Sequence, residues 1–250
     1  MLDISNAIVL TSGGNSVELK IVDVFIEEIK KRTGIRLKKS DNWVENVPVI
    51  VITSEASGFS LIQPYKELLE DLEKPGKEGY RILVKKDKQP VVFIVGSDSR
   101  GVLYGIGKFL RKLSWGKGFI EIPEDLAISM TPKYPLRGHQ LGYRPKTNAY
   151  DAWTVEQFEQ YIRELALFGA NSIEILPPRT DDAPTSPHMK VDPLEMMIKL
   201  SEIIDSYGLD VWVWYPNMFS EEEYKDRSHM EKEIIEREEI FSKLKRIDKV

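Results

Sequence analysis

Residues 134–153 read Tyr-Pro-Leu-Arg-Gly-His-Gln-Leu-Gly-Tyr-Arg-Pro-Lys-Thr-Asn-Ala-Tyr-Asp-Ala-Trp. We expect Leu136–Leu141 to be a short strand that the chain enters through Pro135. A loop rich in charged and aromatic side chains follows this strand. Thr154 and Gln157 then have the capping-box spacing of a helix start. Where parallel strands alternate with helices, ligands bind at the carboxyl ends of the strands, so this loop is a candidate binding segment.

The second half of the chain repeats this strand–helix pattern. Further strands are predicted at Asn171–Leu176 and Asp210–Tyr215, and helices at Val155–Phe168 and after the Asp192 cap. Strands that alternate with helices of this length indicate parallel βα units. We therefore predict an α/β fold in which residues 133–250 form the first units of a (β/α)8 TIM barrel. Because a complete barrel needs about 200–250 residues, the sequence predicts a truncated barrel without its C-terminal half.

The first half of the chain has a different order of elements, which predicts a small α+β N-terminal domain. Two helices, a hairpin and buried strands suggest a mixed sheet with helices on one face. Thr131-Pro132 marks the predicted boundary, so residues 1–132 form one domain and residues 133–250 the other. The strands are expected at Ala7–Leu10, Val47–Thr53, Tyr80–Lys85 and Val91–Val95. The helices are expected to start at a Ser16 cap and at an Asp98 or Ser99 cap.

Composition and charge exclude several classes of protein. The net charge of −5 argues against general binding of nucleic acid or anionic membrane, which needs a basic face. With no cysteine, disulfides and thiolate metal sites are excluded. No apolar run approaches the ~20 residues of a membrane-spanning helix. Residues 1–6 lack the features of a signal peptide, so a periplasmic or secreted location would require that one had been removed.

The predicted first barrel strand supplies two candidate ligands. Arg137 and His139 share one side of the strand with Leu141, and we expect that side to face the barrel interior. An arginine offers several fixed hydrogen-bond donors, which suits a polyhydroxylated or anionic ligand. Alternatively, Arg137 is a structural residue that pairs with Glu174 or an aspartate. Glu174 lies between two isoleucines in the next strand, and it either contacts substrate or pairs with Arg137 or Arg144.

Aromatic and amide side chains complete the candidate site. Trp212 and Trp214 could form a platform for sugar rings or part of the core, whereas Tyr215 and Asn217 at the strand end are better ligand candidates. No standard metal-ligand spacing is found, and residues 96–101 lack the Lys-Ser/Thr of a phosphate loop, so no metal or cofactor is predicted. The predicted substrate-binding residues are Arg137, His139, Arg144, Trp153, Glu174, Tyr215 and Asn217.

Three segments carry a resemblance to a known group of enzymes. Glu18–Leu37 and Val92–Leu113 resemble the non-catalytic N-terminal α/β domain shared by family 20 β-hexosaminidases and family 67 α-glucuronidases. In both families this domain precedes a (β/α)8 barrel, and Pro135-Leu-Arg-Gly138 is similar to the start of that barrel. The resemblance implies that Arg137 binds hydroxyls of the terminal sugar. The catalytic acids of both families come later in the barrel, so no catalytic residue is assigned here.

These observations predict the N-terminal part of a glycoside hydrolase acting on oligo- or polysaccharides. Such an enzyme uses two carboxylates and no cofactor, and we expect the fragment alone to be inactive. One alternative is a carbohydrate-binding or interaction module without catalysis, which would use Arg137, Trp153 and Tyr215. Another is a different barrel enzyme acting on acidic sugars, which Arg137, Arg144 and Arg179 keep open.

Overall fold

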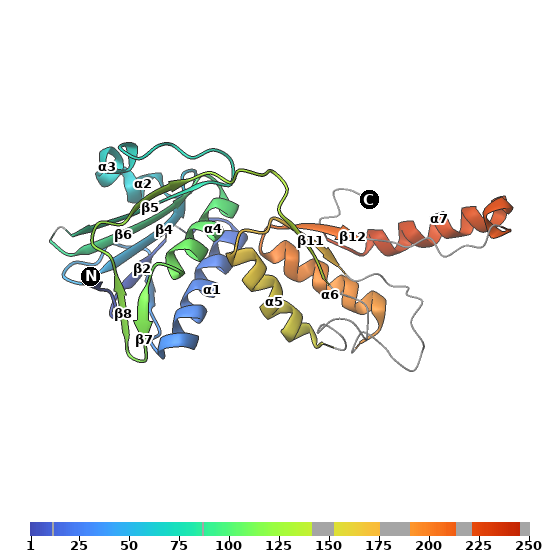
Figure 1. The fold of residues 1–250 in the computed structure, drawn as a ribbon, viewed down its shortest axis with the longest axis horizontal. Coiled ribbons are helices and arrows are strands. Elements are labelled where there is room, and N and C mark those ends of the chain that lie inside the picture. The colour runs from blue at the N-terminus through green and yellow to red at the C-terminus, as the bar shows by residue number, and fades with distance from the viewer. Residues whose placement is uncertain (12, 87, 142–152, 176–190, 214–221, 246–250) are drawn as a thin grey trace. The chain divides into compact units, whose positions relative to one another are not determined.

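A computed structural model describes the chain except for residues 12, 87, 142–152, 176–190, 214–221 and 246–250 (Figure 1). The chain divides into two compact units. The first unit comprises Met1–Pro135 with Ala166–Gly169, and the second comprises Leu136–Leu165 with Ala170–Val250. In the described part of the chain, no helix is long and apolar enough to cross a membrane.

The first unit is built on a mixed six-stranded sheet with the strand order β3-β2-β4-β6-β5-β9. Strands β3, β2, β4 and β6 run parallel, while β5 is antiparallel to both β6 and β9. The bounds are β2 Ile8–Leu10, β3 Lys38–Ser40, β4 Val49–Ser54, β5 Tyr80–Lys86, β6 Pro90–Gly96 and β9 Ala127–Met130. A second, three-stranded sheet has the order β1-β8-β7, with β1 Leu2–Asp3, β7 Ser114–Gly116 and β8 Phe119–Ile122.

Helices α1 (Ser16–Thr33) and α4 (Ser99–Leu110) pack together on one face of the six-stranded sheet (Figure 1). The cap of α4 is Asp98, one of the two predicted caps, whereas the cap of α1 is Asn15, one residue before the predicted Ser16. The Asn15 side chain accepts a hydrogen bond from the Glu18 amide, and Asp98 accepts one from Gly101. Gly34 ends α1 with φ +78°, a backbone conformation that favours glycine. The rings of Phe25 and Phe109 join the two helices at 6.0 Å between centroids.

The other face of this sheet is covered as well, so the prediction of helices on one face is wrong. Three short segments lie there: α2 (Phe59–Ile62), η1 (Gln63–Tyr65) and α3 (Lys66–Glu70). Their Ile62 and Leu69 pack against Val51, Phe93 and Leu83 of three adjacent strands. Segments of three to five residues are too short to show a helical repeat of apolar residues, which is why the sequence did not reveal them.

The second unit contains a parallel sheet with the order β10-β11-β12. Its strands are β10 Gly138–Gln140, β11 Ser172–Ile175 and β12 Asp210–Val213, and its helices are α5 Val155–Leu167, α6 Pro193–Ser206 and α7 Arg227–Ser242, with η2 Glu223–Lys225 before α7. These parallel βα units agree with the sequence prediction. Within the described residues the three strands form an open sheet and not a closed barrel.

Two helix starts in this unit follow the predicted chemistry. The Thr154 amide donates to Gln157 Oε1 at 2.9 Å, and the Gln157 amide donates back to Thr154 Oγ1 at 3.3 Å. This reciprocal pair is a capping box. Asp192 Oδ1 accepts hydrogen bonds from the amides of Leu194 and Glu195 at the start of α6.

Candidate functional site

The three parallel strands of the second unit present two faces with different surroundings. In register, Gly138 lies beside Ser172, and Gln140, Glu174 and Trp212 form a row across the sheet. Because side chains alternate along a strand, these residues share one face, which we call the pocket face. The opposite face, called the helix face, carries His139, Leu141, Ile173, Ile175 and Val211, of which the four aliphatic residues are at most 1% exposed.

The pocket face borders a hollow of about 290 Å³. This volume is just below the ~300–1,000 Å³ of drug-sized ligand sites, so it suits a small ligand. The hollow is lined by Leu136, Gly138, His139, Gln140, Ser172, Glu174 and Trp212. Gln140 is the last residue of β10, and Glu174 and Trp212 are each the third of four residues in their strands. The row therefore lies toward the carboxyl ends of the strands, where α/β folds bind their ligands.

Gln140 and Glu174 are hydrogen-bonded across adjacent strands. Gln140 Nε2 donates to Glu174 Oε1 at 3.0 Å. Gln140 is exposed, Glu174 is half-buried, and the Trp212 side chain beside it is 36% exposed. A carboxylate and an amide oxygen next to an accessible indole ring are thus brought to one edge of the sheet. This combination can accept hydrogen bonds from a ligand and pack against an apolar ring face.

The His139 side chain lies on the helix face, opposite Gly138 and Gln140, although His139 is also among the residues that line the hollow. Its Nε2 is hydrogen-bonded to the Tyr161 hydroxyl of α5 at 2.8 Å. Burial lowers the pKa of His139, which favours the neutral imidazole. Leu141, two residues further on, is fully buried on the same face. Because side chains alternate along the strand, Gly138 and Gln140 lie on the other face.

Trp153 belongs to the same aromatic cluster as His139. Its ring lies 5.8 Å from the Tyr161 ring and 5.6 Å from Phe158, measured between centroids. Tyr161 in turn meets the His139 ring at 5.5 Å, edge to face. The structure therefore brings together two predicted site residues, Trp153 and His139, through a tyrosine that the sequence analysis did not select. Both side chains contact Tyr161 of α5, whereas Gln140, Glu174 and Trp212 lie on the pocket face.

The remaining predicted site residues are placed as follows. The Arg137 backbone is tied to Asn171: its amide donates to Asn171 Oδ1, and its carbonyl accepts from the Asn171 amide. The described partner of the Glu174 side chain is Gln140, and not Arg137 as the alternative interpretation supposed. Arg144, Tyr215 and Asn217 lie outside the described residues, as does Arg179. The substrate-binding roles of the predicted residues stay predictions.

Gln140 was not among the predicted site residues, and Trp212 was predicted either as a platform for sugar rings or as part of the core. A signal for Gln140 was present, since its alternation with His139 places it on the face opposite the histidine. The sequence did not show which of the two faces of β10 borders the hollow. Among the described residues, no group of three or more His, Cys, Asp and Glu side chains could hold a metal ion.

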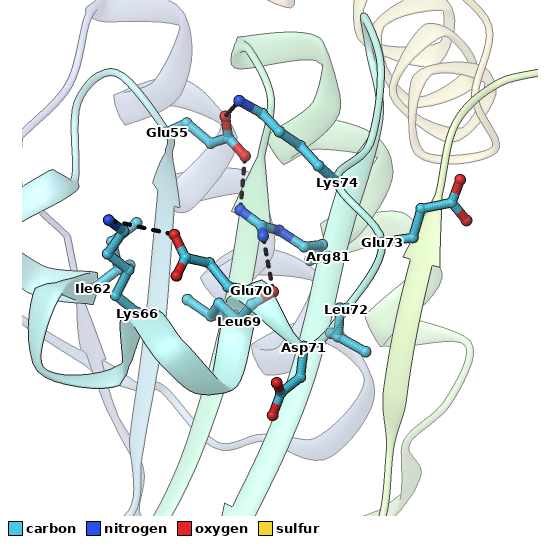
Figure 2. A pocket seen from close by; sticks show the side chains of 10 residues that line it. All are labelled: Glu55, Ile62, Lys66, Leu69, Glu70, Asp71, Leu72, Glu73, Lys74 and Arg81. Atoms are coloured by element: carbon cyan, nitrogen blue, oxygen red, sulfur yellow. Dashed lines mark hydrogen bonds and ion pairs between the residues drawn. The ribbon is translucent and has the colours of Figure 1, made fainter.

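A larger hollow of about 490 Å³ lies in the first unit (Figure 2). Its central group is Arg81 of β5, which is 7% exposed. Arg81 Nη2 donates to Glu55 at 2.7 Å and Nη1 donates to the Leu69 carbonyl at 2.8 Å. Lys74 Nζ lies 3.8 Å from the second oxygen of Glu55. The charges of Arg81, Lys74 and Glu55 are thus paired with one another, and Arg81 also bonds the Leu69 carbonyl of α3. The smaller hollow of the second unit is therefore the better candidate site.

Solved structures with a similar fold include carbohydrate-active enzymes. CpGH84B is 15% identical with a TM-score of 0.61, and the match covers 97% of this chain and 39% of that protein. A mutant β-hexosaminidase from Streptomyces plicatus, in complex with its product GlcNAc, is 13% identical with a TM-score of 0.55, covering 85% of this chain and 42% of that one. A GH20 exo-β-N-acetylglucosaminidase from Vibrio harveyi, in complex with N-acetylglucosamine, is 13% identical with a TM-score of 0.54. The match covers 85% of this chain and 33% of that protein.

At these identities the likeness shows the fold. The chain thus has a fold similar to the corresponding part of family 20 glycoside hydrolases and of GH84 proteins, and it spans about two fifths of the length of the first two. The resemblance to family 20 is confirmed at the level of fold, and the resemblance to family 67 stays a prediction. No family model and no curated protein sequence matches the chain.

Proposed function

We propose that this chain is the N-terminal part of a glycoside hydrolase that acts on oligo- or polysaccharides, and that the pocket face holds a sugar of the substrate. The observation that carries the proposal is the row of Gln140, Glu174 and Trp212 beside the hollow of the second unit. In this proposal β10, β11 and β12 are the first strands of a barrel, the pocket face belongs to its interior, and the first unit is a non-catalytic support.

The chemistry of the row suits a carbohydrate. Sugars present many hydroxyl groups, which are hydrogen-bond donors, and the Glu174 carboxylate offers about four lone-pair sites of which Gln140 uses one. The apolar C–H face of a sugar ring packs against an indole, and Trp212 is accessible beside the carboxylate. Arg137, just before β10, is not among the residues that line the hollow, and its proposed role of holding sugar hydroxyls rests on the resemblance alone.

Glycoside hydrolysis generally requires two carboxyl groups, one as acid and one as base or nucleophile. Among the described residues that line the hollow, Glu174 is the one carboxylate. We therefore assign the described residues to sugar binding and place the catalytic pair on later strands of a longer protein. A carbohydrate-binding module without catalysis is the second candidate, and the single carboxylate of the hollow is the observation that favours it.

The test compares the 250-residue chain with a longer protein that carries further barrel strands. N-acetylglucosamine is the first ligand to try, since two of the similar structures contain it. Ligand-observed NMR of the chain should detect N-acetylglucosamine but not glycerol. The longer protein should release nitrophenol from an aryl N-acetylglucosaminide, whereas the 250-residue chain should not.

The outcomes separate the candidates. Turnover by the 250-residue chain itself would contradict the assignment of the catalytic acids to later strands. Sugar binding without hydrolysis by any longer protein would favour the binding module. If no sugar tested binds either protein, a carbohydrate function is wrong.

A further inference from the structure

We infer that the first unit carries a surface that binds acidic glycans, which are sugar chains with sulfate or carboxylate groups. This surface, called the basic patch, consists of Lys30, Arg36, Lys38 and Lys117. The inference rests on the proposed function, because that function has the chain act on polysaccharides. It concerns a different unit from the hollow beside β10, β11 and β12, so each can fail without the other.

Positive charge is concentrated in one short segment of the first unit. Six of the ten residues from 30 to 39 are lysine or arginine, and none is acidic. The whole chain has 35 basic residues among 250 and a net charge of −5. This net charge disfavours anionic partners over the surface as a whole, but the field near a dense cluster of cations is set by that cluster.

The cations of the basic patch are exposed and keep their charge available. Every member is exposed. None of the four forms an ion pair with another residue in the part of the chain that the structure describes. Lys39 is left out of the patch, because its Nζ pairs with Asp23 at 2.7 Å. The patch therefore presents cations that a partner can neutralise.

The fold adds a cation from a distant part of the sequence to this segment. The Gly118 amide donates to the Thr33 carbonyl at 2.9 Å, so the turn between β7 and β8 lies beside the C-terminal end of α1 (Figure 1). Lys117 belongs to that turn. At Gly34 and Gly118 a side chain would have no described atom within 4 Å, so the junction is open.

Two structural effects account for part of the patch. Lys30 lies in the last turn of α1, where a cation offsets the partial negative charge of the helix end. Lys38 lies on the edge strand β3, where lysine prevents pairing with another chain. Neither effect accounts for Arg36, which lies between these elements, or for Lys117. Bringing like charges together costs free energy, and an anionic partner removes that cost.

The distribution of charge favours an acidic glycan over a nucleic acid. Nucleic-acid-binding domains are usually strongly basic as a whole. The first unit has nearly equal numbers of acidic and basic residues, and its basic patch is local. Sulfate and carboxylate groups accept charge-assisted hydrogen bonds from lysine and arginine, so a glycan that carries them has the complementary chemistry.

The experiment measures binding of the 250-residue chain to three glycans at pH 7 by isothermal titration calorimetry. Heparin carries sulfate and carboxylate groups, polygalacturonate carries carboxylates alone, and dextran is neutral. We expect heparin to bind, with or without polygalacturonate, and dextran not to bind. Raising the salt from about 0.1 M to about 1 M should weaken the binding, because the Debye length falls from about 10 Å to about 3 Å.

A triple variant tests whether the patch is the binding surface. Arg36→Ala, Lys38→Ala and Lys117→Ala together should weaken heparin binding at least about tenfold, the combined scale of three exposed charge interactions.

The matched control replaces three exposed lysines outside the patch, Lys66, Lys77 and Lys232, by alanine. Both variants change the net charge from −5 to −8. The control should change heparin binding by less than about twofold, since the surface and not the net charge is recognised. Circular dichroism checks that both variants are folded, and their substitutions are all at exposed positions.

Three results would overturn the inference. Heparin could bind no better than dextran, or the patch variant could bind heparin as tightly as the control does. Duplex DNA or vesicles of anionic lipid could bind more tightly than both acidic glycans at the same concentration of charge. Each of these leaves the proposed function standing, because that function is tested by N-acetylglucosamine and by hydrolysis of an aryl glycoside.

Discussion

Arg81 is a buried cation in the first unit, and its partners determine what it contributes to stability. Glu55 and the Leu69 carbonyl accept from its terminal nitrogens, but its Nε is a buried nitrogen without a hydrogen-bond partner among the described residues (Figure 2). A buried guanidinium destabilises the folded state unless a carboxylate balances its charge, because an unpaired buried charge is costly. The ion pair therefore fixes α3 and the end of β4 at this place on the sheet.

We predict that Glu55→Ala destabilises the chain by about 2–4 kcal/mol, since it leaves the Arg81 charge without its carboxylate. The control is Glu70→Ala, which removes the exposed pair with Lys66 at 3.3 Å and should cost less than about 1 kcal/mol. Urea unfolding followed by circular dichroism gives both values. Equal costs for the two variants would show that Arg81 does not depend on Glu55.

Tyr207 is a fully buried tyrosine that joins α5 to the end of α6. Its hydroxyl donates to Glu159 Oε1 at 2.6 Å and accepts from Arg163 Nε at 3.1 Å. Burial, and then the hydrogen bond to Glu159, raise the pKa of Tyr207 far above its ordinary value of 10.0. The unfolded tyrosine ionises near pH 10 and the folded one does not.

This difference predicts a pH dependence of stability. Below pH 10 the contribution of Tyr207 is fully present, and it is lost progressively as the pH rises above 10, because the unfolded state then releases a proton that the folded state keeps. Tyr207→Phe should cost about 0.5–1.5 kcal/mol at pH 7 and show a smaller loss of stability between pH 9 and 11. The free energy of unfolding of the wild type and of the variant, measured at these pH values, tests the prediction. Parallel pH profiles for the two proteins would count against it.

At the scale of elements, Tyr161 of α5 holds both ends of the connection between β10 and α5. His139 lies in β10 and Trp153 lies just before α5, and both rings contact Tyr161. The connection itself lies largely outside the described residues. A single side chain thus ties the strand to the helix start that follows it.

We predict different effects for two substitutions of Tyr161. Tyr161→Phe keeps the ring contacts and loses the hydrogen bond to His139, at about 0.5–1.5 kcal/mol. Tyr161→Ala loses both and should cost about 2–4 kcal/mol, with faster hydrogen exchange in the first turns of α5. Gln160→Ala, which removes a half-buried side chain that bonds Glu164, is the neighbouring control. If Tyr161→Ala exchanges like the control, Tyr161 does not anchor the connection.

Element starts were the most predictable part of the fold, because their signals are local. Asp192 and the pair of Thr154 and Gln157 make the caps expected of them. The short strands β3, β7 and β8 and the segments α2, η1 and α3 were not predicted. Three to five residues carry too little pattern, and these elements form because a sheet edge or face is available for them to pair with or pack on.

At the scale of the whole molecule, the six-stranded sheet and the sheet of β10, β11 and β12 differ in how completely their faces are covered. β4 lies between two strands of the six-stranded sheet, and every residue in it is buried. The sheet of β10, β11 and β12 is covered on its helix face, while Gly138, Gln140 and Trp212 are exposed on the pocket face. Opening of the second sheet therefore exposes less additional apolar surface.

Hydrogen exchange should reflect this difference. We predict that the amides of β4 and β6 exchange at least about tenfold more slowly than those of β10 and β12, because exchange from a fully covered sheet needs a larger opening. Mass spectrometry of peptides from each strand measures this. Equal protection of the two sheets would indicate that the chain opens as one cooperative unit.

The sequence by itself determined the alternation of strands and helices in the second half of the chain, the helix caps and the residues that share each side of β10. It also carried the resemblance to family 20, which the similarity of fold confirms. Only the tertiary structure decided which side of β10 is the helix face. Alternation along a strand is symmetric with respect to the two faces, so His139 and Gln140 were equally able to face the hollow. The contact of His139 with Tyr161 of α5 and the burial of Leu141 and Ile173 break that symmetry, and they leave Gln140, Glu174 and Trp212 beside the hollow.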